Sequence, residues 1–321
     1  MSTTPGRARG VALGGALVLS IATAAGPAAP ANARIKCNSK SHGGGAWYQG
    51  KTASNVYDTN FSAGPAVPGL RSYVPQAVAT WHNWDTAGHD LLVVSSYRDG
   101  GGKARLFGID AATGKHVGTV AIAPTHAGGI TITNGWAFVQ GKDSGKKHYV
   151  RKYELSELRG KMTAKGTPYL KQIGKARQVY GSAFLSSYGD NLFAGRFNDK
   201  GRGKMYRYTV ADTGALKTQK GAYEVPTKTQ GLLVTKDHFI YSTSLGNDNR
   251  SNIYVVAGGA RDIDVGSTRC FRAPSMAEGI TEYGGTAYLV YESGSQKYIR
   301  KAPRNIIPNL HKAKVSDIVS F

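Results

Sequence analysis

His126, Glu278 and Glu292 are three side chains of this 321-residue chain whose types suit acid–base chemistry. Two carboxyl groups and an imidazole can donate and accept protons when they lie close enough to shift one another's pKa. Carboxylate oxygens could also hold Ca²⁺, which prefers six to eight oxygen ligands. The same side chains could simply bond backbone groups and water, so their position in the fold decides between these roles.

Their position follows from a short phrase that occurs five times. Each copy begins an apolar strand, and the second residues of the copies recur about every 50 positions: Gln76, Gly128, Ser182, Gln230 and Glu278. A period of about 40 to 50 residues with several strands per repeat is typical of a β-propeller. We therefore predict an all-β fold, a five-bladed β-propeller with four-stranded blades, in which these five residues form a ring around the central channel.

Each repeat continues with turns rich in Gly, Asn or Asp and with further apolar strands. Second strands are predicted at 90–97, 135–141, 191–197, 238–244 and 286–292. Third strands are predicted at 104–110, 148–153, 204–210 and 252–256. Helical periodicity is nearly absent apart from a turn at 155–159, which leaves a chain built almost entirely of strands.

The two ends of the chain offer two ways to complete the fifth blade. We assign residues 34–69 to an N-terminal arm and residues 70–321 to the propeller. Residues 70–74 occupy the place of an outermost strand, so the N-terminal segment could supply that strand. Residues 315–321 could supply it instead, and both segments cannot fill the same position.

The first 33 residues have the pattern of a secretory signal peptide. Arg7 and Arg9 precede an uncharged apolar run over 11–25, and Ala31-Asn32-Ala33 fits an A-x-A cleavage site. We therefore expect a secreted protein without a transmembrane segment, most simply a monomer. In an exported chain the two cysteines, Cys37 and Cys270, are expected to form a disulfide bond, although two free thiols are the alternative.

The chain is strongly basic, with a formal net charge of +21 at pH 7. Such an excess favours polyanions as partners, although it could also serve solubility. Basic residues recur in the predicted turns between second and third strands, which lie on the same face as the ring. We take Lys142, Arg202 and Arg250 as representatives of this predicted basic rim.

The mouth of the channel on that face is the predicted ligand site, because ligands bind in concave places. The predicted binding residues are Gln76, His126, Ser182, Arg196, Gln230, Glu278, Glu292, Lys142, Arg202 and Arg250. His126, Glu278 and Glu292 are also the candidates for catalysis. Only one ring position is acidic, so a channel Ca²⁺ is disfavoured, and we expect no metal and no cofactor.

One hairpin carries a family resemblance. The segment Gly108-Ile109-Asp110-Ala111-Ala112-Thr113-Gly114-Lys115, with a remnant at 211–214, resembles the D-x-x-T-G-K hairpin of bacterial propellers of the broad YncE/quinoprotein-like (WD40-like) superfamily. The chain as a whole is similar to secreted members of that group, and the resemblance implies a protein that binds rather than catalyses. The tryptophan docking motif of quinoproteins is missing, so quinone binding is not implied.

Three functions remain open at this stage. The first is a secreted ligand-binding propeller that recognises an anionic polymer or surface, such as a cell-wall or extracellular polymer, at the channel mouth. The second is a secreted hydrolase of phosphorylated or glycosidic substrates that uses Glu278 or Glu292 with His126. The third is a docking platform for another secreted protein. No H-E-x-x-H, C-x-x-C or P-loop motif supports a zinc protease, a thiol redox site or a nucleotide site.

Overall fold

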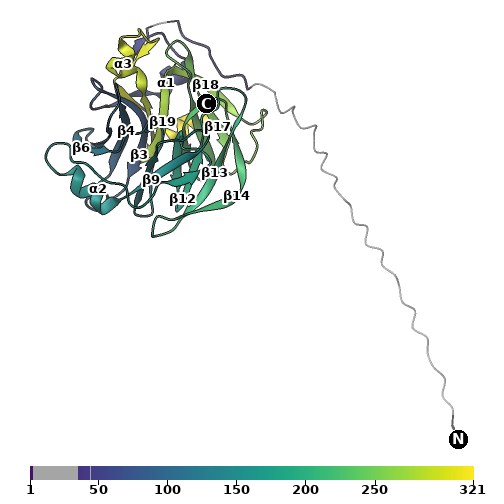
Figure 1. Cartoon of the computed structure of the whole chain (residues 1–321). Helices are drawn as coiled ribbons and strands as arrows, with labels where there is room; N and C mark the ends of the chain where they lie inside the picture. Colours follow the sequence, from purple (N-terminus) through teal and green to yellow (C-terminus); the bar gives the residue numbers. More distant parts are fainter. Residues whose placement is uncertain (3–34, 44) are drawn as a thin grey trace.

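The predicted five-bladed β-propeller is confirmed by the computed structural model, which describes residues 1–2, 35–43 and 45–321. Five four-stranded antiparallel sheets surround a common centre (Figure 1). The predicted signal peptide falls on residues 1–33, nearly all of which lie outside the described residues. Within the described part, none of the helices is long and apolar enough to cross a bilayer.

Four blades are each made by four consecutive strands, with the first strand innermost. The first blade contains β3 (Tyr73–Trp81), β4 (Leu91–Arg98), β5 (Ala104–Asp110) and β6 (His116–Ile122). The second contains β7 (Ile130–Thr133), β8 (Trp136–Gln140), β9 (His148–Glu154) and β10 (Arg177–Val179). The third contains β11 (Phe184–Tyr188), β12 (Asn191–Gly195), β13 (Gly203–Val210) and β14 (Leu216–Val225). The fourth contains β15 (Thr229–Val234), β16 (His238–Thr243), β17 (Arg250–Ala257) and β18 (Arg269–Ser275).

The fifth blade joins the two ends of the chain. It contains β19 (Ala277–Tyr283), β20 (Thr286–Tyr291), β22 (Asn309–Lys314) and β2 (Ser62–Ala66). The N-terminal segment thus supplies the outer strand, at Ser62–Ala66 instead of 70–74, because Tyr73 and Val74 already pair with β4. The alternative closure by 315–321 is wrong: the C-terminal strand is the third of its blade, and the chain then forms α4 (Val315–Ser320).

The N-terminal arm is fastened to the fourth and fifth blades at several points. The short strand β1 (Gln49–Gly50) pairs with β21 (Asn305–Ile306), and Ser54 caps α1 (Asn55–Asn60) by accepting a bond from the Tyr57 amide. The predicted disulfide between Cys37 and Cys270 is confirmed. It joins the arm to β18, so a covalent bond secures the closure that the strand pairing makes.

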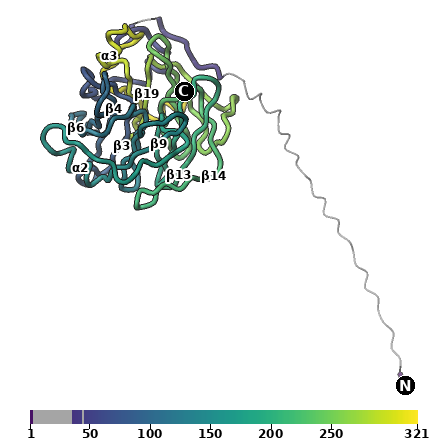
Figure 2. The backbone as a smooth tube through the Cα atoms, in the orientation of Figure 1, coloured from purple at the N-terminus to yellow at the C-terminus, as the bar shows by residue number. Residues whose placement is uncertain are grey.

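The inner strands of neighbouring blades pack against each other in a closed ring. Strands β3, β7, β11, β15 and β19 contact one another in that order around the channel, and Figure 2 shows β19 beside β3 although they are far apart in sequence. The hydroxyl of Thr80 donates to the Glu282 carbonyl oxygen at 2.6 Å, and that of Thr131 donates to Ser187 at 2.8 Å. These bonds fix the inner strands of adjacent blades relative to each other.

Two connections within blades contain helices, one in the second blade and one in the fifth. The turn predicted at 155–159 is a longer helix, α2 (Leu155–Met162), which places Leu158 and Met162 in the core. In the fifth blade, the connection between β20 and β22 contains the 3₁₀ helix η1 (Glu292–Gly294), α3 (Gln296–Ile299) and β21. This connection contributes side chains to the end of the channel at which the ring residues Gln76 and Glu278 lie, which we call the ring end.

Candidate functional site

Three of the five ring residues lie in β-bulges at the start of inner strands. The pairing of β3 with β4 passes from Pro75 to Ala77, and that of β15 with β16 passes from Thr229 to Gly231. The corresponding break in β19 runs from Ala277 to Ile280. A bulge leaves its extra residue unpaired and redirects the side chain. The side chains of Gln76, Gln230 and Glu278 therefore do not follow the regular alternation of their strands.

The central feature at this end of the channel is a pair of buried carboxyl groups, Glu278 and Glu292. They are only 2% and 9% exposed. The Gln76 side-chain amide donates to Oε1 of Glu292, and the Gln230 amide donates to Oε1 of Glu278 at 3.3 Å. Two glutamines from the neighbouring first and fourth blades therefore hold the two glutamates of the fifth blade.

Burial and mutual repulsion shift the titration of this pair. Burial, together with the charge of Glu292, raises the pKa of Glu278 well above its ordinary value. Burial also raises the pKa of Glu292, to about 7, although hydrogen bonds from Gln76 and Tyr298 oppose the shift. Carboxyl groups in such a site cannot both ionise easily. The pair therefore retains a proton near neutral pH.

A chain of polar side chains connects this pair to the surface. Tyr298 of α3 hydrogen-bonds to Glu292 and to Tyr97 at the end of β4. The ammonium group of Lys297 donates to the Tyr97 hydroxyl at 2.7 Å. Tyr97, Lys297 and Tyr298 are half-buried, so they mark the route from solvent to the carboxyl groups.

His126 lies at the same mouth but does not join the carboxyl pair. Its exposed side chain stacks on the Tyr97 ring with 4.8 Å between ring centroids. Partial desolvation by the surrounding loops, together with the charge of Lys297, lowers the pKa of His126. Among the described residues, no hydrogen bond connects His126 to Glu278 or Glu292. The structure thus brings two of the three candidate acid–base groups together.

The other two ring positions belong to a separate polar cluster. Ser182 donates to Oδ1 of Asp143 at 3.3 Å, and Oδ2 of Asp143 lies 2.9 Å from Nδ1 of His148. At Gly128, where the ring has no side chain, the Gln140 side-chain oxygen accepts a bond from the backbone amide at 2.6 Å. Ser182 and Gly128 therefore face partners of the second blade instead of the carboxyl pair.

The predicted basic residues have different surroundings. Lys142 is exposed, and Arg196 is exposed with its guanidinium 5.3 Å from the Tyr180 ring centre. Arg202 forms an ion pair with Glu224 at 2.8 Å. Arg250 donates two bonds to the carbonyl oxygen of Thr52 in the N-terminal arm, at 2.7 and 3.0 Å. Arg202 and Arg250 therefore also hold parts of the chain together.

Charge is distributed unequally between the two faces of the propeller. We call the face with the second-to-third-strand connections the basic face, because cationic side chains outnumber acidic ones there. The exposed or half-buried cations of these connections include Lys103, Lys142, Lys146, Lys147, Arg196, Lys200, Lys297, Arg300 and Lys301. The exposed or half-buried acids are Asp99, Asp143, Asp199 and Asp248. We call the opposite face, with the first-to-second-strand turns, the hairpin face. Its first-to-second-strand turns carry Asp85, Asp90, Asp190 and Asp237 with Lys236. Its third-to-fourth-strand connections, further from the channel, carry both signs, among them Lys115, Lys165 and Arg261 with Glu157, Asp212 and Asp264. Positive potential is therefore concentrated over the ring end of the channel.

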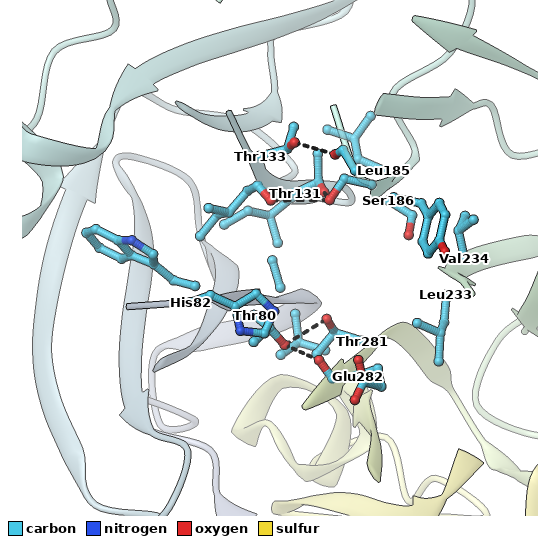
Figure 3. Close-up of a pocket in the computed structure, with 18 of the residues that line it drawn as sticks. Thr80, His82, Thr131, Thr133, Leu185, Ser186, Leu233, Val234, Thr281 and Glu282 are labelled. Atoms are coloured by element: carbon cyan, nitrogen blue, oxygen red, sulfur yellow. Dashed lines mark hydrogen bonds between the residues drawn. The ribbon is translucent and has the colours of Figure 1, made fainter. Parts of the chain in front are cut away.

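A cavity of about 720 Å³ opens at the hairpin face. Inner strands of all five blades line it, and Figure 3 shows Thr131, Leu185, Leu233 and Thr281 around its open centre. Sequence reasoning placed the concave site at the other mouth and did not identify this one. The signal was present as an apolar residue two or three positions after each of the five ring residues.

Sequence reasoning also missed the polar partners at the ring end. Gln140 and Tyr298 were not predicted, and Lys297 was expected only as a basic residue of the rim. No repeat position marks Tyr298, which lies on a helix found in one blade alone. Gln140 ends its second strand much as Glu292 follows β20, so alignment of the blades could have revealed it. In the described residues, no group of three or more His, Cys, Asp or Glu side chains could hold a metal ion.

Comparisons with known proteins assign no family. No family model matches the chain, and no curated protein matches it. Similar solved structures include hydrazine synthase of Kuenenia stuttgartiensis, with 10% identity, a TM-score of 0.39 and coverage of 70% of this chain and 58% of that one. A quinoprotein alcohol dehydrogenase-like protein of Bacteroides thetaiotaomicron gives 14% identity, a TM-score of 0.34 and coverage of 68% and 49%. The WD40 domain of Toxoplasma gondii coronin gives 12% identity, a TM-score of 0.32 and coverage of 75% and 59%.

Proposed function

We propose that this protein is a secreted binding propeller that recognises an anionic extracellular polymer through its basic face. The observation that carries the proposal is the unequal distribution of charge. Lysine and arginine side chains gather in the connections around one mouth of the channel, whereas the first-to-second-strand turns around the opposite mouth are mainly acidic. Solubility requires no such separation of charges between faces.

Several exposed side chains make the basic face suitable for a long ligand. Lys142, Lys146 and Lys147 lie on one connection of the second blade, and Arg300 and Lys301 lie on the connection of the fifth. These connections flank the mouth at which Lys297, Tyr97 and His126 meet. A polymer with repeated phosphate or carboxylate groups can contact several of these cations together, and each contact adds to the affinity.

Secretion is part of the proposal and has independent support. A disulfide bond between Cys37 and Cys270 is typical of proteins that fold in an oxidising compartment. The pattern of residues 1–33 is that of a signal peptide. Both observations support secretion, which would bring the protein into contact with cell-wall or extracellular polymers.

The experiment is a salt titration of binding to inorganic polyphosphate, followed by fluorescence anisotropy. If cations of the basic face contact phosphates, the logarithm of the binding constant falls linearly with the logarithm of salt concentration, with a slope of about −0.7 per contact. We expect a slope steeper than about −2, corresponding to at least three contacts. Binding that does not change between low and physiological salt would exclude this proposal.

A hydrolase is the second candidate, and the carboxyl pair favours it. Glu278 and Glu292 form a closely spaced acid pair whose raised pKa values suit proton transfer near neutral pH. The appropriate test is a panel of model phosphoesters and glycosides with the wild-type protein and Glu278→Gln. Turnover that is lost in Glu278→Gln while the melting temperature is retained would support catalysis. Absence of turnover across the panel would leave binding as the function of this mouth.

A further inference from the structure

The cavity at the hairpin face is a cup with an aliphatic lining. Each blade contributes at least one aliphatic residue from its inner strand, and Val78, Ile130, Leu185, Leu233 and Ile280 form a ring of five. Toward the basic face, the channel beyond them holds the buried side chains of Gln76 and Glu278. The volume of about 720 Å³ lies within the range of small-molecule sites, about 300 to 1,000 Å³.

Several hydroxyl groups in the wall are already engaged by neighbouring blades. Thr80 bonds to the Glu282 carbonyl oxygen at 2.6 Å and lies 3.1 Å from the Thr281 hydroxyl. Thr133 donates to the carbonyl oxygen of Gly189 at 2.7 Å. Their methyl groups and the aliphatic ring thus remain for contact with a ligand. A nonpolar ligand body leaves few polar groups of the wall unsatisfied, so its burial is favourable.

The rim of the cavity is acidic. Asp190 is exposed and Glu282 is half-buried there, and Lys236 is the opposing charge among the lining residues. His82 is bonded to Asp90 through Nδ1 at 2.7 Å, so a third carboxylate lies beside that imidazole. Such a rim repels a carboxylate or phosphate and attracts an ammonium group.

We propose that this cavity is a second binding site, for an organic cation that combines a compact aliphatic body with an ammonium group. The aliphatic body of the ligand packs against the five aliphatic side chains that the blades contribute to the wall. Its ammonium group remains at the rim near Asp190 and Glu282. The site opens on the opposite face from the polymer site, so both ligands can bind at once. The two sites also select opposite charges.

The test uses three probes with the same globular hydrocarbon body: adamantylammonium, adamantanol and adamantanecarboxylate. Binding is followed by methyl NMR of isoleucine, leucine and valine in the full chain. We expect adamantylammonium to shift the methyl signals of Ile130, Leu185 and Leu233, with affinity in the order ammonium, alcohol, carboxylate. Charge contributions at an exposed rim predict steps of roughly 2- to 5-fold in affinity.

A matched pair of charge reversals tests the rim. Asp190→Lys changes an exposed lining residue, whereas Asp237→Lys makes the same change on a neighbouring turn outside the lining. We expect the first to weaken adamantylammonium binding by roughly 3- to 10-fold and to strengthen carboxylate binding, and the second to leave both nearly unchanged. Equal effects of the two variants, or equal affinity for all three probes, would overturn the assignment to cations. Absence of shifts at the cavity methyl groups with every probe would overturn the site itself.

Discussion

At the scale of single residues, the pair of Glu278 and Glu292 combines two unfavourable conditions. Each carboxyl group is almost completely removed from water, and each ionised form would repel the other. The amides of Gln76 and Gln230 donate to the pair and offset part of this cost. Because a raised pKa means that the folded protein holds its proton more tightly than the unfolded chain, this pair makes stability depend on pH.

The replacement Glu292→Gln tests this account. The pKa of Glu292 rises from 4.5 in the unfolded chain to about 7 in the folded protein. The protonated carboxyl therefore stabilises the fold fully below pH 4.5, and this contribution is lost as the pH rises through 7. In the wild-type protein, we expect this loss of the proton to lower the free energy of unfolding by about 3 kcal/mol between pH 4.5 and 7. In Glu292→Gln, urea unfolding should show a smaller loss over this interval.

The control for this prediction is Glu157→Gln, which replaces an exposed carboxylate on α2. Its pH dependence should match that of the wild-type protein. If Glu292→Gln and Glu157→Gln unfold with the same pH dependence, the carboxyl pair does not hold a proton in the way described.

The residue scale also shows how far sequence could predict the site. The period identified Gln76, Gln230 and Glu278 as one ring, because each occupies the same place in its repeat. It also placed Glu292 near them through the end of the second strand. The orientation of His126 and the contribution of Tyr298 depend on loops that no repeat governs, so position in the sequence did not determine them.

At the scale of elements, the N-terminal arm completes the fifth blade through a buried hydrogen-bonded cluster. Tyr57 of α1 contacts both β20 and β22: its hydroxyl is 2.7 Å from that of Tyr291 and also contacts Nδ1 of His311. All three side chains are buried. Burial lowers the pKa of His311 to about 3, so the imidazole remains neutral and can share this bond.

Tyr57→Phe should therefore destabilise the protein. It removes one hydroxyl and leaves two buried partners without it, which costs about 1–3 kcal/mol. The matched control is Tyr241→Phe, because Tyr241 is equally buried and its hydroxyl has no hydrogen-bond partner among the described residues. That variant should change stability by less than about 1 kcal/mol or increase it. Thermal and urea unfolding of both variants measures the difference, and equal losses would contradict the proposed role of the cluster.

Sequence reasoning left open which end of the chain closes the propeller, and it did not identify the residues that do so. Gly64 and Pro65 make Ser62–Ala66 look unlike a strand, yet an outer strand tolerates Pro because it pairs along one edge only. The third strand of the fifth blade was missed because the connection before it is long and contains helices. The pairing of β22 with β20 and of β2 with β22 determines both strands. The local sequence pattern does not reveal this tertiary pairing.

At the scale of the whole molecule, the propeller separates two chemistries along one channel. One mouth has a basic surround above a buried acid pair, and the other has an acidic rim around an aliphatic cup. The inner strands run from one mouth to the other, and hydrogen bonds between neighbouring blades hold these strands in a ring. A binding function at one mouth can therefore be altered by mutation without disturbing the other.

The most direct measurement compares polyphosphate affinity after matched charge reversals on the two faces. Lys146→Glu with Lys147→Glu changes two exposed lysines of the basic face, and Lys115→Glu with Lys236→Glu changes two exposed lysines at the other ends of the blades. Both double variants lower the net charge equally. At low salt we predict that the first weakens binding by about tenfold or more and makes the salt slope shallower by about 1.4, whereas the second leaves the slope unchanged. Equal losses in both variants would show that net charge alone attracts the polymer and would contradict recognition by the basic face.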